Sequence, residues 1–295
     1  RRGAFDGAGN FTKSFQKKFS EKLSIESNKE MSTSSTQPSK PLAAIILAAG
    51  KGMRMDSDLP KVLHQVAGKP MVQWVIDAVN ETGADRVILV IGHGAQLVKE
   101  TISGETQGVE VEYVLQEPQR GTGHAVLVCK DTLNEFEGNI VILGGDGPLL
   151  RSSTIRAMIN RQGSTDATAT LATSTIPDPS GYGRIVRDEQ DRFEAIVEQK
   201  NATPEQLVIQ EVYPSYAIVE SNALWECLDN LQPNALTNEY YFTEVPRMLL
   251  DKGLSVEVIN SVAPEDILSI NTPQQLAEVE TVLLARLQNE MEPIV

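Results

Sequence analysis

The sequence contains few of the residues on which several classes of protein depend. Its 295 residues include two cysteines, Cys129 and Cys227, and three histidines. The two cysteines show no metal-ligand or redox spacing and no disulfide framework, which fits two buried thiols in a cytoplasmic protein. The longest apolar run, Leu42 to Ala49, is too short to span a bilayer, so we expect no membrane partner.

Positive charge is scarce outside the first forty residues. Residues 1–40 hold eight Lys and Arg against four Asp and Glu, which leaves 18 basic and 36 acidic residues in 41–295. A body this acidic repels a polyanion, so we expect no DNA or RNA partner. Any anionic ligand must therefore be bound by a few local cations.

Composition divides the chain near residue 40. Residues 1–40 are rich in Ser, Thr and Lys and lack apolar periodicity, which predicts a disordered N-terminal tail. An organelle transit peptide is an alternative, but the four acidic residues count against it.

Length alone allows one large α/β domain or two small ones. We expect one domain over 41–295 that ends in a C-terminal helix.

From Pro41 onward, apolar runs of strand length alternate with amphipathic helical patterns, which is typical of a sheet with helical crossovers. The last predicted helix opens with Thr272-Pro273-Gln274-Gln275, a predicted capping box with proline at the first helical position. Further helices are predicted near 221–230 and 239–252. The predicted strands cover 42–48, 86–92, 110–115, 139–144, 167–175, 183–188, 193–198 and 211–219.

The stretch LAAGKGMRMDSDLPKVLH, residues 47–64, follows the first predicted strand. It is not a P-loop, because its glycine spacing is wrong, and Met55 replaces the third glycine of a dinucleotide fingerprint. It is a turn in which Gly50 and Gly52 let backbone N–H groups approach an anion. Arg54 and Lys61 can reach the same anion. An ordinary tight turn is the alternative.

Two further strand ends carry polar groups. Gln116 precedes EPQRGTGHAV, and its amide can pair with a pyrimidine edge while Gly121 and Thr122 let the base lie against backbone. Asp146, in LGGDGPLL, follows the fourth predicted strand, and ligands bind at that edge of open α/β sheets. For a lone Asp at a strand end, an N-cap is the alternative role. His124, at a predicted helix start, is interpreted as a structural hydrogen-bonding residue.

Six motifs in collinear order resemble one family: LAAGKGMRMDSDLPKVLH, QEPQRGTGHAV, GGDGPLL, GYGRIVRD…IVEQKNAT, NEYYFTEV and INTPQQLAEVE. Over residues 42–285 the chain resembles the pyrophosphorylase domain of the bacterial bifunctional N-acetylglucosamine-1-phosphate uridylyltransferases/glucosamine-1-phosphate acetyltransferases. The resemblance implies an α/β, Rossmann-like nucleotidyltransferase fold of the nucleotide-diphospho-sugar transferase type, with a mixed, mostly parallel sheet flanked by helices.

The resemblance also implies an activity. We expect Mg²⁺-dependent transfer of UMP from UTP to a hexosamine 1-phosphate, with N-acetylglucosamine 1-phosphate as the expected substrate and UDP-N-acetylglucosamine and pyrophosphate as products. The alternatives are a related nucleotidylyltransferase with another sugar or base, and a non-catalytic nucleotide-sugar binding protein. A dinucleotide-dependent oxidoreductase is disfavoured by Met55.

The resemblance assigns roles to individual residues. The nucleotide loop is formed by Leu47, Ala48, Ala49 and Gly50, the triphosphate is contacted by Arg54 and Lys61, and uracil is read by Gln116, Gly121 and Thr122. Mg²⁺ is held by Asp146 and Asn271, oxygen ligands that suit a hard cation. The sugar is contacted by Gly183 and Glu198. For Asn271 and Glu198 the alternatives are a residue leading into the last helix and a solvated strand end.

Two departures from the family pattern affect these expectations. Where the family usually has Asn-Thr/Ser-Gly, with the Asn touching the sugar, this chain has Tyr213-Pro214-Ser215. The sugar contact therefore falls on Tyr213, which leaves the identity of the sugar open. The hexapeptide repeats of the acetyltransferase half do not follow the last predicted helix, so we expect no acetyl-CoA site and no acetyl transfer.

Overall fold

The computed structural model describes residues 40–102 and 109–291, which belong to one compact unit that begins at Lys40. Apart from Lys40, the predicted N-terminal tail lies outside the described residues. No helix in these two ranges is long and apolar enough to cross a membrane.

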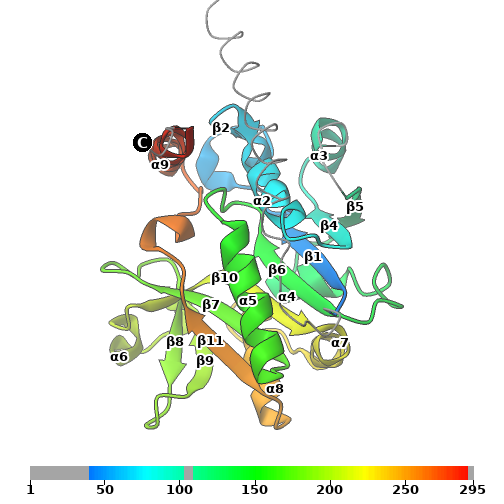
Figure 1. Cartoon of the computed structure of the whole chain (residues 1–295), viewed down its shortest axis with the longest axis vertical. Helices are drawn as coiled ribbons and strands as arrows, with labels where there is room; N and C mark the ends of the chain where they lie inside the picture. The colour runs from blue at the N-terminus through cyan, green and yellow to red at the C-terminus, as the bar shows by residue number, and fades with distance from the viewer. Residues whose placement is uncertain (1–39, 103–108, 292–295) are drawn as a thin grey trace, which may run out of the picture. The chain divides into compact units, whose positions relative to one another are not determined.

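One mixed sheet organises the described residues (Figure 1). Its strands follow the order β11-β7-β10-β6-β1-β4-β5, in which β10 runs against the direction of the other six. The mixed, mostly parallel sheet predicted from the sequence is confirmed. Its strands are β1 (Leu42–Leu47), β4 (Arg86–Ile91), β5 (Val111–Leu115), β6 (Asn139–Gly144), β7 (Ala169–Thr175), β10 (Glu211–Glu220) and β11 (Val256–Asn260).

Two small additions flank this sheet. The hairpin of β8 (Gly183–Arg187) and β9 (Phe193–Val197) is joined to it because β8 pairs with β10. A separate ribbon is formed by β2 (Gln65–Val66) and β3 (Lys69–Pro70). The predicted strand positions agree with the structure to within two residues at each end.

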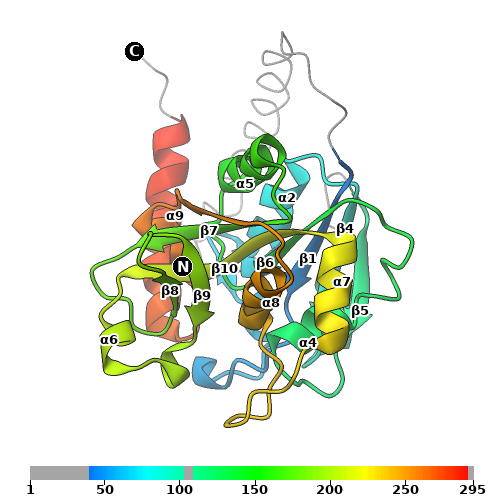
Figure 2. The same ribbon diagram turned by 90° about the horizontal axis from the view of Figure 1, so that it is seen from below.

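Helices cover both faces of the sheet (Figure 2). One face is covered by α2 (Met71–Asn80) and α5 (Ser152–Thr165), and the other by α4 (Thr122–Leu127), α7 (Ser221–Asn230) and α8 (Val245–Asp251). This two-sided cover explains why the central strands are almost continuously apolar and buried. The remaining helices are α3 (Ala95–Ile102), α6 (Pro204–Leu207), α9 (Pro273–Met291), and the 3-10 turns η1 (Met53–Met55), η2 (Lys61–Leu63), η3 (Gln199–Asn201), η4 (Phe242–Glu244) and η5 (Pro264–Ile267).

The predicted helix over 239–252 begins too early. The α-helix α8 begins only at Val245, preceded by η4, and Tyr241 before η4 is extended. Tyr240 N–H donates to the carbonyl of Arg120 at 2.8 Å, and Tyr240 O accepts from Gly123 N–H at 2.8 Å. These hydrogen bonds to a distant loop use the backbone groups that an earlier helical turn would need.

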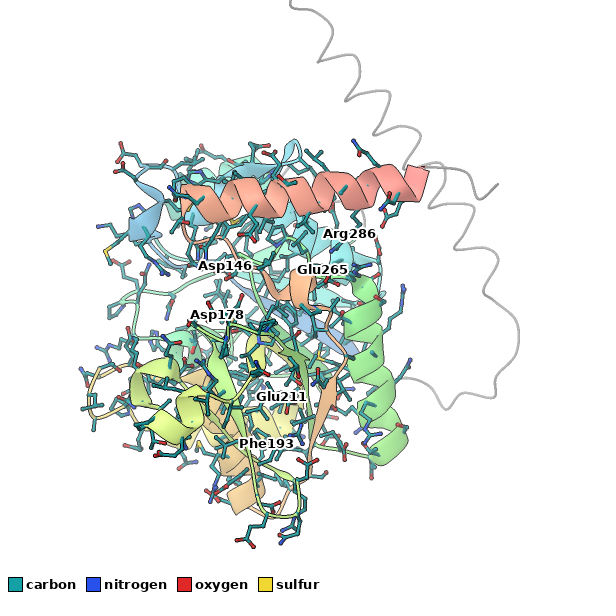
Figure 3. All side chains as sticks on the ribbon, turned by 90° about the vertical axis from the view of Figure 1, so that its left-hand side faces the viewer. Asp146, Asp178, Phe193, Glu211, Glu265 and Arg286 are labelled. Atoms are coloured by element: carbon teal, nitrogen blue, oxygen red, sulfur yellow. The ribbon has the colours of Figure 1, made fainter. Side chains whose placement is uncertain are left out.

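A buried carboxylate fastens the long helix α9 to the rest of the domain. Asp266, in η5, is 2% exposed and accepts hydrogen bonds from Arg286 of α9 and from Arg151 Nε at 2.5 Å. Arg286 Nη1 also donates to Leu149 O at 2.9 Å. Figure 3 shows Arg286 on α9 above the segment that carries Glu265. Ile270 N–H, shortly before α9, donates to Asp146 O at 3.0 Å, which holds the start of α9 near the carboxyl edge of the sheet.

Substituting Arg286 should test this attachment. We expect Arg286→Met to lower the free energy of unfolding by about 3 kcal/mol, because it leaves a buried carboxylate with one cationic partner fewer. Arg161→Met, which breaks the more exposed pair with Glu257, should cost less than about 1 kcal/mol. Urea unfolding curves measure both changes. Equal losses in the two variants would contradict the anchoring role of Asp266.

Candidate active site

The carboxyl ends of β1 and β6 place the glycine loop beside Asp146. Leu47, the last residue of β1, is paired in register with Gly144, the last residue of β6. Gly145 N–H donates to Leu47 O at 2.9 Å. Asp146 caps no helix, since α5 begins at Ser152 with Arg151 at its N-cap. The alternative of an N-cap for Asp146 is therefore wrong.

Three predicted site residues meet at one point. Lys61 Nζ lies 2.5 Å from Asp146 Oδ2 and donates to Asn271 Oδ1 at 3.0 Å. A carboxylate oxygen and an amide oxygen from distant segments thus converge on one cationic group. The side chain of Lys61 is only 13% exposed, which strengthens this interaction relative to a surface ion pair.

Local hydrogen bonds orient Asn271 for this contact. Its Nδ2 donates to Ser269 Oγ at 3.2 Å, which directs the amide oxygen toward Lys61. Its backbone N–H donates to Gln275 Oε1 at 2.9 Å. The predicted capping box is therefore half correct: Gln275 N–H donates to Thr272 Oγ1 at 3.2 Å, but the Gln275 side chain accepts from Asn271 instead of Thr272.

The oxygen pair fits a hard divalent cation. Asp146 and Asn271 supply a carboxylate and an amide oxygen, and the Lys61 ammonium group stands in for a cation between them. Within residues 40–102 and 109–291, no cluster of three or more His, Cys, Asp or Glu is placed to hold a metal ion. Phosphate oxygens and water are the usual further ligands of a magnesium ion bound by so few protein groups.

Glycines leave the space that the cluster needs. Gly52 has φ +63°, and a Cβ there would lie 2.6 Å from Lys61 Cβ, so this glycine packs directly against the lysine. A Cβ on Gly144 would lie 2.9 Å from Asp146 Oδ1. Gly50, in contrast, faces open space and is exposed. Gly50 is therefore the position where the loop leaves its backbone accessible to a ligand.

Arg54 is not part of the cluster. It lies in η1 and is exposed, and it makes no hydrogen bond or ion pair with any described residue. Ala48 and Ala49 are buried, and Ala49 O accepts hydrogen bonds from His93 N–H at 3.2 Å and from Gln119 Nε2 at 2.5 Å. The glycine loop is thus tied to the segment that follows Gln116.

The predicted base-reading residues lie together after β5. Gln116 is 5% exposed, and its Nε2 donates to Gly121 O at 3.0 Å. Gly121 has φ +100°, and a Cβ there would lie 2.5 Å from Tyr240 O, so only glycine fits. Thr122 begins α4 and accepts from Phe242 N–H through its hydroxyl at 3.0 Å. This hydrogen bond occupies one acceptor site of the hydroxyl.

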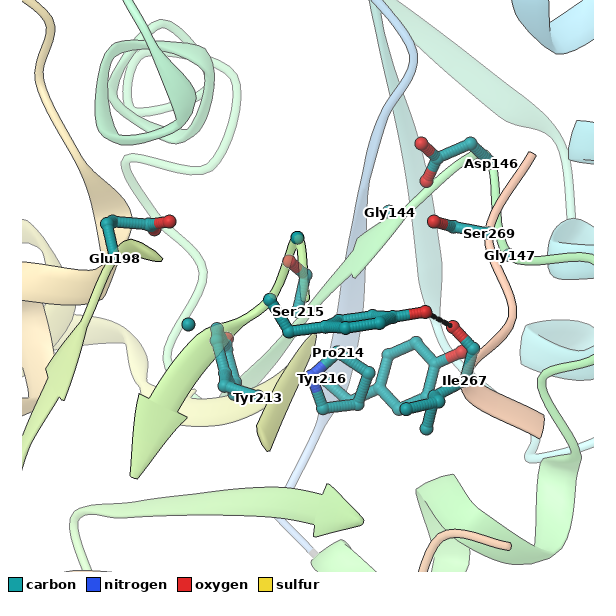
Figure 4. Close-up of a pocket in the computed structure, with 13 residues that line it drawn as sticks. Gly144, Asp146, Gly147, Glu198, Tyr213, Pro214, Ser215, Tyr216, Ile267 and Ser269 are labelled. Atoms are coloured by element: carbon teal, nitrogen blue, oxygen red, sulfur yellow. Dashed lines mark hydrogen bonds between the residues drawn. The ribbon is translucent and has the colours of Figure 1, made fainter. Parts of the chain in front are cut away.

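A cavity of about 160 Å³ adjoins Asp146 on the side of β10. Asp146 and Glu198 lie at opposite sides of it, with Tyr213 and Ser215 between them (Figure 4). The predicted sugar residues Gly183, Glu198 and Tyr213 are therefore brought together with Asp146, whereas Gln116 is not among the residues that line the cavity. The cavity lining is Gly144, Asp146, Gly147, Gly181, Tyr182, Gly183, Glu198, Tyr213, Pro214, Ser215, Tyr216, Ile267 and Ser269.

Two ionisable groups in this cavity are shielded from water. Burial raises the pKa of Glu198, although Thr243 Oγ1, which donates to Glu198 Oε1 at 3.1 Å, opposes the rise. Burial also raises the pKa of Tyr213, which is 4% exposed and whose hydroxyl makes no hydrogen bond with any described residue. A buried hydroxyl without a partner costs free energy, and because this oxygen is fully enclosed, the cost is borne by the folded protein itself.

The strand around Tyr213 is irregular. The pairing of β10 with β7 shifts register between Val212 and Tyr216, and Ser215 has φ +68°. Pro214 lacks a backbone donor, so it cannot contribute to a regular ladder. The Tyr213-Pro214-Ser215 departure therefore coincides with a β-bulge that aims side chains into the cavity.

Several residues around the site were not identified from the sequence. Ser269 and Gln275 orient Asn271, and Thr243 contacts Glu198. Tyr182 donates through its hydroxyl to Ile267 O at 2.9 Å at the cavity wall. Tyr182 and Thr243 stand inside two of the quoted motifs, GYGRIVRD and NEYYFTEV, so their position in those motifs was the available signal.

Substituting Gly52 should separate backbone strain from contact with Lys61. We expect Gly83→Ala to cost about 1 kcal/mol, because φ is +76° but a Cβ meets nothing within 4 Å. Gly52→Ala should cost about 1–3 kcal/mol more, since its Cβ overlaps that of Lys61. Urea unfolding of both variants measures the difference. An equal cost would show that Gly52 does not position Lys61.

Comparisons with known proteins agree with this architecture. The family described as the MobA-like NTP transferase domain matches residues 44–211. The structure is similar to that of a UDP-glucose pyrophosphorylase complexed with UDP-glucose, with a TM-score of 0.71 at 16% identity over 83% of this chain and 99% of that chain. This likeness confirms the predicted nucleotide-diphospho-sugar transferase fold.

Curated relatives share more sequence. The chain is 40% identical over 250 residues to the bifunctional protein GlmU of Geobacter metallireducens, covering 85% of this chain and 52% of that protein. It is 42% identical over 244 residues to the GlmU of Halalkalibacterium halodurans, covering 83% and 52%. The chain thus spans about half the length of these relatives, and the resemblance read from its motifs is confirmed. The chain is a nucleotidyltransferase that belongs to the MobA-like NTP transferase domain family.

Proposed function

We propose that this protein transfers UMP from UTP to a hexosamine 1-phosphate, with release of pyrophosphate. The observation that carries the proposal is the convergence of Asp146 and Asn271 oxygens on a cationic group between an open glycine loop and a polar cavity. Together these groups would bind phosphates, a divalent cation and a sugar along one sheet edge, which supports the proposal. The matches to the MobA-like NTP transferase domain family and to bifunctional GlmU proteins support a nucleotidyl transfer.

The reaction needs no general base. A phosphate oxygen of the sugar 1-phosphate is already anionic at neutral pH, so it attacks the α-phosphorus of UTP directly. The new bond joins that oxygen to the α-phosphorus, and the bond to the pyrophosphate oxygen breaks. The task of the protein is to align two polyanions and to neutralise charge on the leaving oxygens. This chemistry therefore requires no Ser, Cys or His nucleophile.

The cationic residues would supply charge neutralisation. Arg54 is exposed beside the glycine loop and makes no hydrogen bond or ion pair with a described residue, so it can bind the triphosphate without breaking an ion pair. Lys61 would exchange its contacts with Asp146 and Asn271 for contacts with phosphate oxygens. Because the chain carries a net charge of −14, these local cations must overcome long-range repulsion of the substrates.

Asp146 and Asn271 would hold Mg²⁺. Bound there, the ion would neutralise phosphate oxygens and help to fix their orientation. Glu198 and the cavity residues would bind the sugar, while Gln116, Gly121 and Thr122 would bind the base. These roles divide the site along the sheet edge, with the base end after β5 and the sugar end beside β10.

A sugar other than N-acetylglucosamine is favoured by one observation. Tyr213 stands where the family usually has an Asn that touches the sugar, and its buried hydroxyl lacks a partner in the described part of the chain. A phenol cannot offer the paired donor and acceptor of an amide. A related hexosamine or hexose 1-phosphate that needs no amide at this position is therefore the second candidate substrate.

Substituting Asp146 should test the metal site. We expect Asp146→Ala to lower UTP-dependent pyrophosphate release by at least about a hundredfold, because charge neutralisation at the phosphates is lost. It should also weaken Mn²⁺ binding measured by electron paramagnetic resonance. Asp131→Ala, at an exposed position, is the matched control. Unchanged Mn²⁺ affinity in Asp146→Ala, with an intact fold by circular dichroism, would overturn the assignment of the metal site.

Two substitutions of Tyr213 should distinguish steric obstruction from a working contact. We expect Tyr213→Asn to raise kcat/KM for N-acetylglucosamine 1-phosphate on the order of tenfold, because an amide pairs with more of the substrate's polar groups. Tyr213→Phe, which removes only the hydroxyl, should leave that value unchanged. The measurement compares N-acetylglucosamine, glucose and N-acetylgalactosamine 1-phosphates. A loss of activity in both variants would show that the Tyr213 hydroxyl binds the sugar.

A further inference from the structure

The orientation of the Gln116 amide is set by its surroundings. Gln116 is 5% exposed, and its backbone N–H donates to Ile91 O at 2.8 Å. The segment that follows it is tied to the glycine loop through Gln119, whose Nε2 donates to Ala49 O at 2.5 Å. Gln116 is therefore a buried amide attached to the proposed nucleotide loop and not a mobile surface side chain.

Both amide hydrogens of Gln116 are used within the protein. Gln116 Nε2 lies 3.0 Å from Gly121 O and 3.1 Å from His124 Nδ1. A backbone carbonyl can only accept, so the group that faces it must be the NH₂ end of the amide. The second N–H then points at His124 Nδ1, which must present its lone pair. His124 is thereby assigned the tautomer with its proton on Nε2.

His124 is kept neutral by its environment. It is half-buried at the start of α4, and burial lowers its pKa, with a further lowering from the neighbouring charge of Arg120. The aromatic ring of Tyr240 lies beside the imidazole, with the two ring centroids 6.4 Å apart. A neutral imidazole keeps Nδ1 as an acceptor, whereas a protonated one would direct an N–H at the Gln116 amide group.

The remaining polar atom of Gln116 is its carbonyl oxygen. Among the described residues, no donor is recorded in a hydrogen bond with Gln116 Oε1. This oxygen is not fully enclosed by protein atoms, so a ligand can approach it. Gln116 thus presents an acceptor to a ligand. The two hydrogen bonds that its Nε2 donates within the protein keep the donor end of the amide turned away from that ligand.

An acceptor at this place distinguishes the two pyrimidine bases. Uracil carries an N3–H donor, whereas cytosine has a lone pair at N3. Opposite Gln116 Oε1, uracil N3–H forms a hydrogen bond and cytosine N3 meets an acceptor of like polarity. If the amide were reversed, its NH₂ group would favour cytosine. The choice of base therefore depends on which end of the amide is anchored.

We propose that His124 is a positioning residue that selects uracil over cytosine by locking the Gln116 amide with its carbonyl oxygen toward the base. The inference rests on the proposed function, since it requires Gln116 to face a nucleotide. His124 touches no reacting atom and acts through Gln116. A merely structural histidine would change stability but not the preference between bases.

The experiment compares kcat/KM for UTP and CTP in three proteins: wild type, His124→Leu and His124→Asn. In His124→Leu the acceptor is lost, and the UTP-over-CTP ratio should fall about tenfold, as for one buried hydrogen bond. In His124→Asn the side-chain oxygen can replace Nδ1 as acceptor, so the ratio should stay near that of wild type. The KM for the sugar 1-phosphate should not change in either variant.

The wild-type protein supplies a test that needs no substitution. The Nδ1 acceptor is present above the pKa of His124 and is lost as the imidazole protonates below it. Because that pKa is lowered from the usual value of about 6.5, the UTP-over-CTP ratio should fall only below about pH 6.5. The ratio in His124→Asn should not show this fall. Nitrogen-15 NMR of the imidazole should show the proton on Nε2 at neutral pH.

The outcomes separate the two proposals. No turnover with UTP in folded wild-type protein would overturn the proposed function. Turnover with UTP together with an unchanged UTP-over-CTP ratio in His124→Leu would overturn the role of His124 and leave the proposed function standing. If His124→Leu does not fold, a wild-type ratio that stays constant through the protonation of His124 overturns the role equally.

Discussion

The ion pair of Lys61 with Asp146, completed by the amide oxygen of Asn271, is the interaction on which the site depends. Lys61 comes from η2, Asp146 from the loop after β6, and Asn271 from the segment before α9. One ammonium group therefore joins three parts of the chain that are far apart in sequence. Because the domain is acidic, the partly buried Lys61 ammonium group also neutralises the charge of the Asp146 carboxylate while no ligand is bound.

The surroundings of this cluster serve to hold its members in place. Gly52 leaves room for Lys61, and Gly144 leaves room for the Asp146 carboxylate. Ile270 N–H donates to Asp146 O at 3.0 Å, which joins the two oxygen-bearing segments through the backbone. Behind them, Asp266 binds Arg286 of α9, so the helix that begins after Asn271 cannot move independently of the sheet. The precision of the site thus derives from buried contacts outside it.

The two ends of the site are built differently. At the base end, glycine at position 121 permits a close backbone approach, and both amide hydrogens of Gln116 are satisfied. At the sugar end, β10 is bulged and the hydroxyl of Tyr213 has no partner in the described residues. A side chain whose polar groups are all hydrogen-bonded is held in one orientation, whereas no hydrogen bond to a described residue fixes the enclosed Tyr213 hydroxyl. We therefore expect the base preference to follow the family and the sugar preference to be particular to this protein.

The sequence by itself determined the alternation of strands and helices, the direction of most strands and the set of motifs at the strand ends. These features are local, because a buried parallel strand is an apolar run and a phosphate-binding turn needs glycine. Only the tertiary structure decided that residues 239–241 are not helical, that Gly52 packs on Lys61, and that His124 contacts the Gln116 amide. Each of these depends on hydrogen bonds and contacts between groups whose separation in space is not encoded by their spacing along the chain.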